Sequence, residues 1–406
     1  MEKVVIIGGG PSGIVAGIVA KKDDNEVLIL ERNSKPLKKL LMTGNGKCNY
    51  FNELYGDNCY YSEDMDIASK IISSNNIDSA KEFLDSLGIV SKIKNGCYYP
   101  FSNQASTIWK ILVDEAKRCG VKIICDCLVT DILKNGNEFH ISTDKDNYYC
   151  DKLVLATGSC AYPKTGSDGM GYSFLKKFSH TIVEPVPALV PLIIKNSIKE
   201  WDGIRTDVEL KLFEDGNFIG KEEGEIQLTS YGISGICTFN LTHTISRGLF
   251  LKRKEVVKIN FVPFIKTLIT PWMHQYSKKH AEKRLGDLLE GFLNYKLVSV
   301  ILNRCNLSRN VYYQELTNDE KLLLCKTLRS FEVDVVDTRG FDFSQVCNGG
   351  VKLTEIDYHS MESKRIPGLY IVGELIDMNG KCGGYNLTTC WISGMLAGKS
   401  IGGKND

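Results

Sequence analysis

The chain has 406 residues, of which 43% are hydrophobic and 24% charged, a composition typical of a globular protein with a large core. This length corresponds to roughly two or three domains. Its 50 lysine and arginine residues nearly balance 49 aspartate and glutamate residues, so the overall charge gives no reason to bind nucleic acid or an anionic membrane.

The N-terminal apolar run, MEKVVII, is too short for a signal peptide and leads directly into a glycine loop. No apolar stretch reaches the length of about 18 residues that a membrane span needs. We therefore expect a cytoplasmic protein. The 14 cysteines include no Cys-x-x-Cys pair and the six histidines show no metal-ligand spacing, which predicts reduced thiols and no bound metal.

The first elements have the pattern of a dinucleotide-binding fold. Residues 3–7 predict a buried strand. Gly8, Gly10 and Gly13 follow in the spacing G-x-G-x-x-G, where the strand leads into a helix. Glycines there let the backbone approach a pyrophosphate, whose charge the helix N-terminus offsets. A second strand ends in Glu31, which can hold both ribose hydroxyls and disfavours a 2′-phosphate. This pattern suits NAD and FAD alike.

Two later segments favour FAD. The sequence SKPLKKLLMTGNGKCNYFN follows the second strand, where simple nicotinamide dehydrogenases usually continue into another βα unit. Within it, GNGKC lacks the spacing and the Ser/Thr of a P-loop, which excludes nucleoside-triphosphate hydrolysis. A strand at Lys152–Ala156 then leads into Thr157-Gly158 and a glycine-rich loop, a common return of the chain to the cofactor's phosphates.

The middle of the chain lacks βα alternation. Alternating strand patterns flank Asp215-Gly216, a hairpin signal, and residues 268–329 have helical patterns before a strand returns. We expect this segment to be an insert that shapes a substrate pocket. The predicted domains are therefore 1–189 and 347–406 for the two segments of the cofactor-binding domain, and 190–346 for the inserted substrate or cap domain.

The C-terminal segment predicts a second helix N-terminus. A strand at Leu369–Val372 leads into Gly373-Glu374, and Asp377 is placed to accept from a ribityl hydroxyl or to reach the pyrophosphate. A glycine loop then precedes a helix that starts near Asn386. Its free N–H groups, from Gly384 to Leu387, can stabilise the negative charge of a reduced flavin at the pyrimidine end of its ring.

Taken together, these blocks resemble a known family. The motifs GGGPSG, TGNGKCNYFN, ATGSCAYPKTGSDGMGY and PALVPL, and the stretch from residue 360 to 394, are similar to successive blocks of the BaiN-like (YhiN-like) NAD(P)/FAD-dependent oxidoreductases. The resemblance covers residues 4–400. That family includes bile-acid dehydro-reductases and aminoacetone oxidases. The resemblance implies an α/β, Rossmann-like FAD-binding domain of the glutathione-reductase type, with an inserted β-rich, barrel-like domain and a small helical subdomain.

The resemblance also implies which residues line FAD. The family often has arginine where this chain has Lys47, and lysine keeps the charge but loses the two-pronged donor geometry. The candidate cofactor-binding residues are Gly8, Gly10, Gly13, Glu31, Gly46, Lys47, Cys48, Asn49, Val129, Gly158, Gly373, Glu374, Asp377, Gly384, Asn386 and Leu387.

Reduction of an activated C=C bond needs a hydride at one carbon and a proton at the other. Tyr162, Lys164 and Tyr385 are the candidate proton donors, because their loops are expected to converge on the flavin ring. Asp168 is expected to hold its own glycine-rich turn rather than to act as a base.

Three functions are consistent with the sequence. The first, which we favour, is an NAD(P)H-using flavin reductase of an activated C=C bond in a hydrophobic, steroid-like or bile-acid-like enone. The second is an FAD-dependent oxidase of an amine, aminoacetone or an amino acid, with O2 as oxidant. The third, least favoured, is a flavoprotein with a binding or RNA-modification role. The expected partner is a small hydrophobic molecule, without nucleic acid or membrane, and the oligomeric state stays open.

Overall fold

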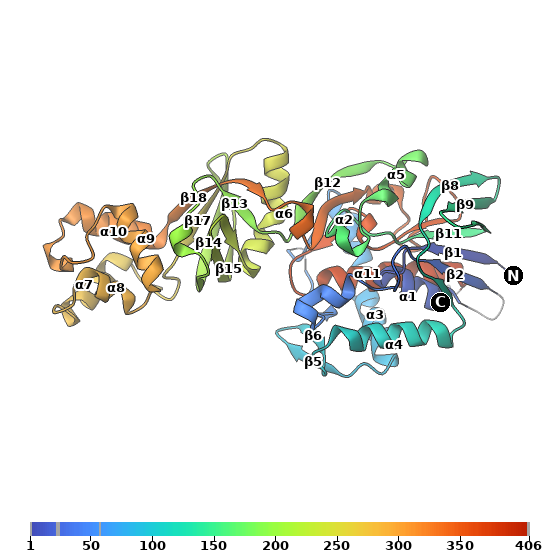
Figure 1. The fold of residues 1–406 in the computed structure, drawn as a ribbon, viewed down its shortest axis with the longest axis horizontal. Coiled ribbons are helices and arrows are strands. Elements are labelled where there is room, and N and C mark those ends of the chain that lie inside the picture. Colours follow the sequence, from blue (N-terminus) through green and yellow to red (C-terminus); the bar gives the residue numbers. More distant parts are fainter. Residues whose placement is uncertain (1, 22–24, 57, 404–406) are drawn as a thin grey trace. The chain divides into compact units, whose positions relative to one another are not determined.

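The computed structural model of the chain describes residues 2–21, 25–56 and 58–403. They form two compact units (Figure 1). One, which we call the sheet unit, joins Met1–Val186 to Ser344–Asp406, and the other, the barrel unit, consists of Pro187–Phe343. The boundaries that the sequence places after residues 189 and 346 lie close to these junctions.

The sheet unit is built on a five-stranded parallel sheet with the order β20-β11-β1-β2-β7. Its strands are short, and most of their residues are buried, as in parallel sheets that are covered on both faces. The strands are β1 (Lys3–Ile7), β2 (Glu26–Leu30), β7 (Lys122–Ile124), β11 (Lys152–Leu155) and β20 (Leu369–Ile371). The prediction of a Rossmann-type α/β fold is confirmed.

The first and last long helices of the sheet unit, α1 (Pro11–Ala20) and α11 (Tyr385–Ile401), pack directly against each other. Glycines in α11 allow this close approach. A Cβ added at Gly394 would lie 2.5 Å from the backbone oxygen of Ser12, and one at Gly398 would lie 2.6 Å from the Cβ of Val19. The contact brings the two ends of the chain together.

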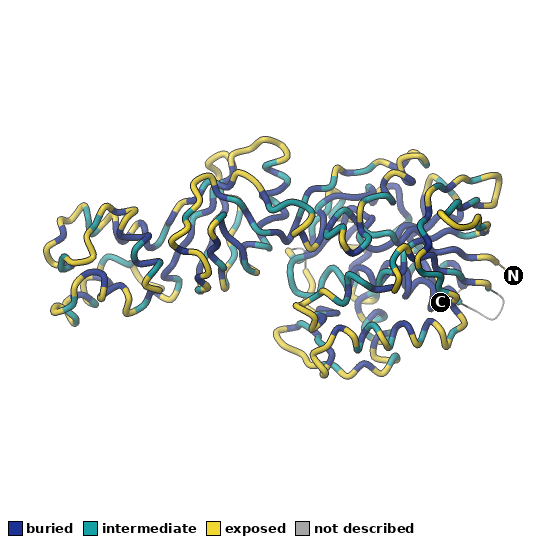
Figure 2. The backbone as a smooth tube through the Cα atoms, viewed as in Figure 1, coloured by how far each residue is buried: buried dark blue, intermediate teal, exposed yellow. Residues whose placement is uncertain are grey.

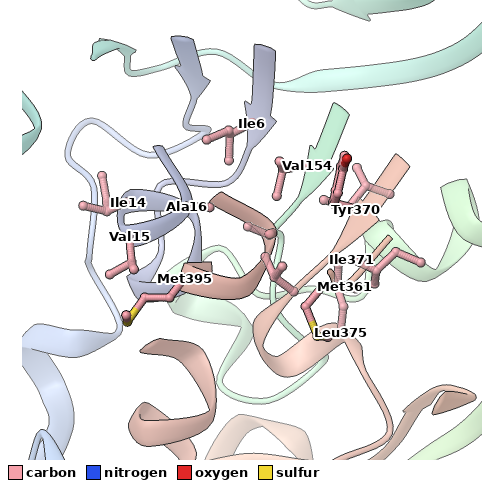
Figure 3. Packing of buried hydrophobic residues seen from close by; sticks show 14 of the residues in the cluster. Ile6, Ile14, Val15, Ala16, Val154, Met361, Tyr370, Ile371, Leu375 and Met395 are labelled. Carbon is pink, nitrogen blue, oxygen red and sulfur yellow. The ribbon is translucent and has the colours of Figure 1, made fainter. Parts of the chain in front are cut away.

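A continuous hydrophobic core holds this unit together. Most buried residues of the unit lie in its sheet and in the helices packed on it (Figure 2). Figure 3 shows part of this core, to which Ile6 and Val154 from neighbouring strands, Ile14 of α1 and Met395 of α11 all belong. All four side chains are buried. The core fixes the strand ends from which the loops of the candidate site emerge.

Smaller elements complete the sheet unit. Antiparallel strands form the sheets β10-β9-β8, β3-β6-β5 and β21-β4, and β12 pairs with β19. The strands are β3 (Phe51–Asn52), β4 (Tyr60–Tyr61), β5 (Ser91–Lys94), β6 (Cys97–Pro100), β8 (Val129–Asn135), β9 (Glu138–Thr143), β10 (Asn147–Cys150), β12 (Ile182–Ala188), β19 (Val346–Val351) and β21 (Asn379–Gly380). The helices are α2 (Met65–Ile71), α3 (Ser74–Ser86), α4 (Ala105–Arg118) and α5 (Met170–Lys177), with short 3-10 turns η1 (Leu40–Gly46), η2 (Pro163–Thr165), η6 (Leu353–Glu355) and η7 (Gly373–Leu375).

The barrel unit is a closed antiparallel barrel with its own core and a helical part. The expected hairpin is present, because Asp215 and Gly216 connect β14 to β15. The strands, in barrel order, are β13 (Leu192–Ile194), β16 (Gly232–Ser234), β15 (Asn217–Thr229), β14 (Arg205–Glu214), β17 (Glu255–Asn260) and β18 (Phe331–Thr338). The helices are α6 (Ile236–Phe250), α7 (Ile269–Lys279), α8 (Leu285–Glu290), α9 (Tyr295–Cys305) and α10 (Asn318–Arg329), with 3-10 turns η3 (Lys199–Trp201), η4 (Tyr313–Glu315) and η5 (Phe341–Phe343).

The inserted barrel-like domain with a helical part is therefore confirmed, and its helices α7 to α10 lie between Ile269 and Arg329. Within the described part of both units, no helix combines the length and the apolar character that crossing a membrane requires.

Candidate functional site

The loop between β1 and α1 contains three glycines with two different roles. A Cβ added at Gly8 would lie 2.4 Å from the Ala156 oxygen, and one at Gly13 would lie 2.1 Å from the Gly8 oxygen. Both glycines are thus required by the protein's own packing. At Gly10, φ is −76° and an added Cβ would meet, among the described residues, just the Ala156 oxygen at 3.9 Å. Gly10 therefore keeps a space clear at the start of α1, where free N–H groups can bind an anion.

Glu31 lies at the end of β2 beside this loop, and its carboxylate is buried. It accepts hydrogen bonds from the backbone N–H of Gly9 at 2.8 Å, from the backbone N–H of Asn33 at 2.8 Å and from the Asn33 side chain at 2.6 Å. A carboxylate offers about four acceptor positions, so Glu31 is held in place with capacity left for a hydroxyl. No motif marks Asn33, and sequence reasoning missed it.

Glu374 connects three segments that are distant in the sequence. Its carboxylate accepts from Lys39 Nζ at 2.6 Å and from Ser159 Oγ at 3.1 Å. The Tyr172 hydroxyl donates to the Glu374 backbone oxygen at 3.3 Å. The predicted segments around residues 35–52, 157–169 and 373–377 therefore meet at one carboxylate. Lys39 and Ser159 were not expected, because their roles depend on a partner more than 200 positions away.

The N-terminus of α11 lies against residues 49–52. Gly383 and Gly384 have φ of +137° and +95°, and a Cβ at Gly384 would lie 2.8 Å from both Asn49 Oδ1 and the Phe51 oxygen. Asn52 Nδ2 donates to the Gly383 oxygen at 2.7 Å. Among the described residues no side chain caps α11, so the N–H groups of its first turn face this region without a side-chain acceptor.

Sequence comparison with known proteins places the chain in a family. It matches the HI0933-like protein Rossmann domain over residues 2–400. The chain belongs to this family. It is 35% identical to the 3-dehydro-bile acid delta(4,6)-reductase of Clostridium scindens, over 98% of this chain and 99% of that protein. It is also 25% identical to the ribosomal RNA dihydrouridine synthase of Escherichia coli, over 98% and 97% of the two chains.

Solved structures share the fold of this HI0933-like protein. A flavocytochrome c3 fumarate reductase aligns with a TM-score of 0.50 and 16% identity, over 99% of this chain and 78% of that one. The 3-ketosteroid-delta4-(5alpha)-dehydrogenase of Rhodococcus jostii RHA1 aligns with a TM-score of 0.50 and 15% identity, over 99% and 97%. The fold is thus the Rossmann-type FAD-binding fold.

The residues of this HI0933-like protein fit FAD. The space at Gly10 and the acceptor capacity of Glu31 suit a pyrophosphate and a ribose. Two buried polar atoms near these loops, Thr157 Oγ1 and Asn49 Oδ1, have no hydrogen-bond partner among the described residues. Leaving such an atom unpaired costs about 1–3 kcal/mol, so a polar ligand is the expected partner. The chain is an FAD-dependent oxidoreductase. No group of three potential metal ligands occurs among the residues that the structure describes.

Two cofactor candidates already have roles within the protein. Asn386 uses its side chain to fix its own loop, accepting from Gly380 N–H at 2.8 Å and donating to the Gly380 oxygen at 2.8 Å. Asp377 is buried and its Oδ2 accepts from the Glu63 N–H at 2.9 Å. These bonds position the loops, so any contact of these side chains with FAD would be additional.

The other cofactor candidates are spread over the same unit. Gly46 and Lys47 are exposed at the end of η1, and Val129 is buried at the start of β8. Gly158 has φ of +75°, and its added Cβ would lie 2.4 Å from Ser167 Oγ. Cys48 is buried, and burial raises the pKa of its thiol to about 11, so it is neutral at physiological pH. Gly373, with φ of +70°, and Leu387 lie at the starts of η7 and α11.

The three proton-donor candidates belong to two segments of the chain. Tyr162 and Lys164 belong to a loop whose Thr165 oxygen accepts from Asn33 Nδ2 at 3.0 Å, and Asp168 of the same loop pairs with Arg32. This loop is therefore attached next to Glu31. Tyr385 instead opens α11, where its ring packs edge-on against Tyr60 with centroids 5.6 Å apart.

Proposed function

We propose that this protein reduces the C=C bond of a hydrophobic, steroid-like enone, with FAD as cofactor and NAD(P)H as the source of electrons. The observation that carries this proposal is the similarity over almost the whole chain to a bile-acid reductase. Because the similarity extends over almost the whole of both chains, the reductase has counterparts of both units of this protein. These include the insert, which is expected to shape a substrate pocket.

FAD, when bound, supplies the hydride that adds to the carbon β to the carbonyl. The uncapped N-terminus of α11 contributes a fixed positive potential that stabilises negative charge near its first turn. The proton for the α carbon must come from a group that is still protonated at neutral pH. Tyr385 is the first residue of α11, at the helix N-terminus that is expected to face the flavin. Burial raises the pKa of its hydroxyl, which is therefore protonated at neutral pH. We assign Tyr385 as the proton donor, ahead of Tyr162 and Lys164.

NAD(P)H has no dedicated domain in this proposal. The chain has no second G-x-G-x-x-G motif between a strand and a helix. We infer that the nicotinamide binds transiently where the substrate later binds, and leaves before the enone enters.

Anaerobic stopped-flow mixing tests this function. We expect NADPH or NADH to bleach the flavin absorbance, and a 3-keto-4-ene steroid to restore it with a product two hydrogen atoms heavier by mass spectrometry. Bleaching by aminoacetone alone, with peroxide formed in air, would instead establish the oxidase.

A matched pair of variants tests the proton donor. In Tyr385→Phe we expect unchanged bleaching by NAD(P)H but a product-forming step about 100-fold slower, because the general acid is lost. Tyr149→Phe changes an exposed tyrosine of β10 and is expected to leave both steps unchanged. Equal rates in the two variants would remove Tyr385 from this role.

A second candidate is reduction of uracil in ribosomal RNA. Two relatives, 25% and 24% identical over 98% of this chain, are ribosomal RNA dihydrouridine synthases. The C5=C6 bond of uracil is conjugated to a carbonyl, so the reaction is of the same class. Incubation of uridine-containing ribosomal RNA with the reduced protein distinguishes the two substrates. Dihydrouridine formation without steroid turnover would replace the enone as the substrate.

A further inference from the structure

Lys39 and Glu374 form an ion pair between two segments of the sheet unit that are 335 positions apart in the sequence. Lys39 Nζ lies 2.6 Å from Glu374 Oε2, and the two side chains are 22% and 20% exposed. Salt screens partly buried charges of this kind less than it screens charges at the surface. The Ser159 hydroxyl also donates to Glu374 Oε2, at 3.1 Å. Two donors from distant segments therefore hold this carboxylate in place.

Both segments of this ion pair are attached to the start of α1. The Leu37 N–H, shortly before the lysine of the pair, donates to the Gly9 oxygen at 2.8 Å. A Cβ added at Gly373, which directly precedes the glutamate, would lie 2.4 Å from Ser12 Oγ in the first turn of α1. The ion pair therefore joins two segments that each contact the glycine loop or the helix N-terminus, where the pyrophosphate of FAD is expected to bind.

A carboxylate beside this loop opposes the binding of a pyrophosphate unless a cation neutralises it. A helix N-terminus supplies about +0.5 of an elementary charge, which is less than the negative charge of a pyrophosphate. Glu31 adds a second carboxylate next to the same loop, because its Oε2 accepts from the Gly9 N–H at 2.8 Å. Among the residues that the structure describes, Lys39 is the basic residue that forms an ion pair with Glu374.

We propose that Lys39 belongs to the FAD site, where it neutralises Glu374 and so allows the start of α1 to accept the pyrophosphate of the cofactor. The neutral pair leaves the positive potential of the helix N-terminus available to the phosphates. Glu374 can then connect its three segments without repelling the cofactor. The proposal rests on the binding of FAD and is independent of the identity of the substrate.

Fluorescence titration of the full-length apoprotein with FAD, at low and at high NaCl, tests this role. In Lys39→Met we expect FAD affinity at low salt to fall about tenfold, because the uncompensated carboxylate repels the phosphates. High salt should recover part of this loss by screening the repulsion, whereas the affinity of the unchanged protein should not rise with salt. Lys39→Arg keeps the charge and should bind FAD like the unchanged protein. Lys39→Gln, which is uncharged but can still donate to Glu374, provides the same comparison where Lys39→Met does not fold.

A double variant separates neutralisation of the carboxylate from a structural role of the lysine. Glu374→Gln removes the charge that Lys39 compensates, so adding Lys39→Met to Glu374→Gln should cost no further FAD affinity. The matched control is the exposed ion pair of α4 between Lys110 and Asp114, where Lys110→Met, alone or with Asp114→Asn, should leave FAD affinity unchanged at both salt concentrations.

Three results would overturn the role of Lys39. They are an unchanged FAD affinity in Lys39→Met, a loss of affinity that does not respond to salt, and an equal loss in the Glu374→Gln background. If the unchanged protein itself binds no FAD, the cofactor assignment fails, and the role of Lys39 fails with it.

Discussion

The surroundings of buried polar groups differ between the two units. In the sheet unit, unpaired atoms such as Thr157 Oγ1 lie near glycine loops, and at Gly10 the structure leaves open space. In the barrel unit, both carboxyl oxygens of Glu255 are buried without a donor among the described residues, but a Cβ at Gly248 would lie 1.8 Å from Oε1. The carboxyl group of Glu255 therefore packs directly against α6 at Gly248. The sheet unit therefore keeps space for a ligand at Gly10, whereas the buried carboxyl group of Glu255 in the barrel unit has a perturbed ionisation.

The largest effect is expected where a glycine of the sheet unit has no space at all. Gly13→Ala would place a Cβ 2.1 Å from a backbone oxygen, and we expect it to lower the free energy of unfolding of this unit by about 3 kcal/mol, the upper range for overpacking. Gly220→Ala in the barrel unit has no atom within 4 Å of the new Cβ and is the matched control. Urea unfolding measures both, and equal stabilities would contradict the assignment of Gly13 to internal packing.

The next prediction concerns the ligand that the sheet unit is expected to hold. Glu31→Ala removes an acceptor for the ribose hydroxyls, so we expect FAD binding to weaken by about 1.5–3 kcal/mol, the contribution of hydrogen bonds to a charged group. Fluorescence titration of the apoprotein with FAD measures the change. Glu255→Gln, in the other unit, should bind FAD like the unchanged protein. Equal affinities in both variants would remove Glu31 from the site.

The stability of the barrel unit should instead depend on pH. Burial, followed by the negative charges of Glu214 and Asp215, raises the pKa of Glu255 to about 8, although Arg253 opposes the shift. Between pH 4.5, the ordinary pKa of a glutamate, and about pH 8, the Glu255 carboxyl is therefore protonated in the folded state and ionised in the unfolded state. The contribution of this proton to the free energy of unfolding is complete below pH 4.5. It is lost as the pH rises towards 8, by at most about 1.4 kcal/mol per pH unit.

Hydrogen exchange of β14 and β17, measured from pH 5 to 9 and corrected for the intrinsic rate, tests this dependence. Protection should fall as the pH rises in the unchanged protein and stay flat in Glu255→Gln. A falling profile in that variant would assign the titration to another group.

The smallest effect on stability, and the sharpest test of the comparison, is expected at Gly10. Because an added Cβ finds space there, Gly10→Ala should change the free energy of unfolding by less than about 0.5 kcal/mol. The same methyl group would occupy the space left for the pyrophosphate, so we expect FAD affinity to fall about tenfold, or about 1.4 kcal/mol. Thermal unfolding and FAD titration measure the two effects. A variant that binds FAD normally would show that the space is not used.

The sequence predicted most of the elements because their signals are local. The strands at 3–7 and 152–156, the hairpin at Asp215-Gly216 and the helical part of the insert follow from periodicity and turn residues within a few positions. The glycine loop and Glu31 were identified in the same way, since strand, turn and acid follow one another along the chain. That Tyr162, Lys164 and Tyr385 converge on the flavin ring stays a prediction, because it depends on how distant loops lie around a bound cofactor.

Local sequence by itself determined the Rossmann-type start of the chain, the β-rich insert with its helical part and the two helix N-termini, because each depends on neighbouring residues. The tertiary structure decided which distant residues meet: Lys39 with Glu374, Asn33 with the loop that contains Thr165, and residues 49–52 with the start of α11. The physical reason is that strand order and helix packing, not spacing along the chain, set these contacts. Side chains separated by as many as 335 positions then share one hydrogen bond.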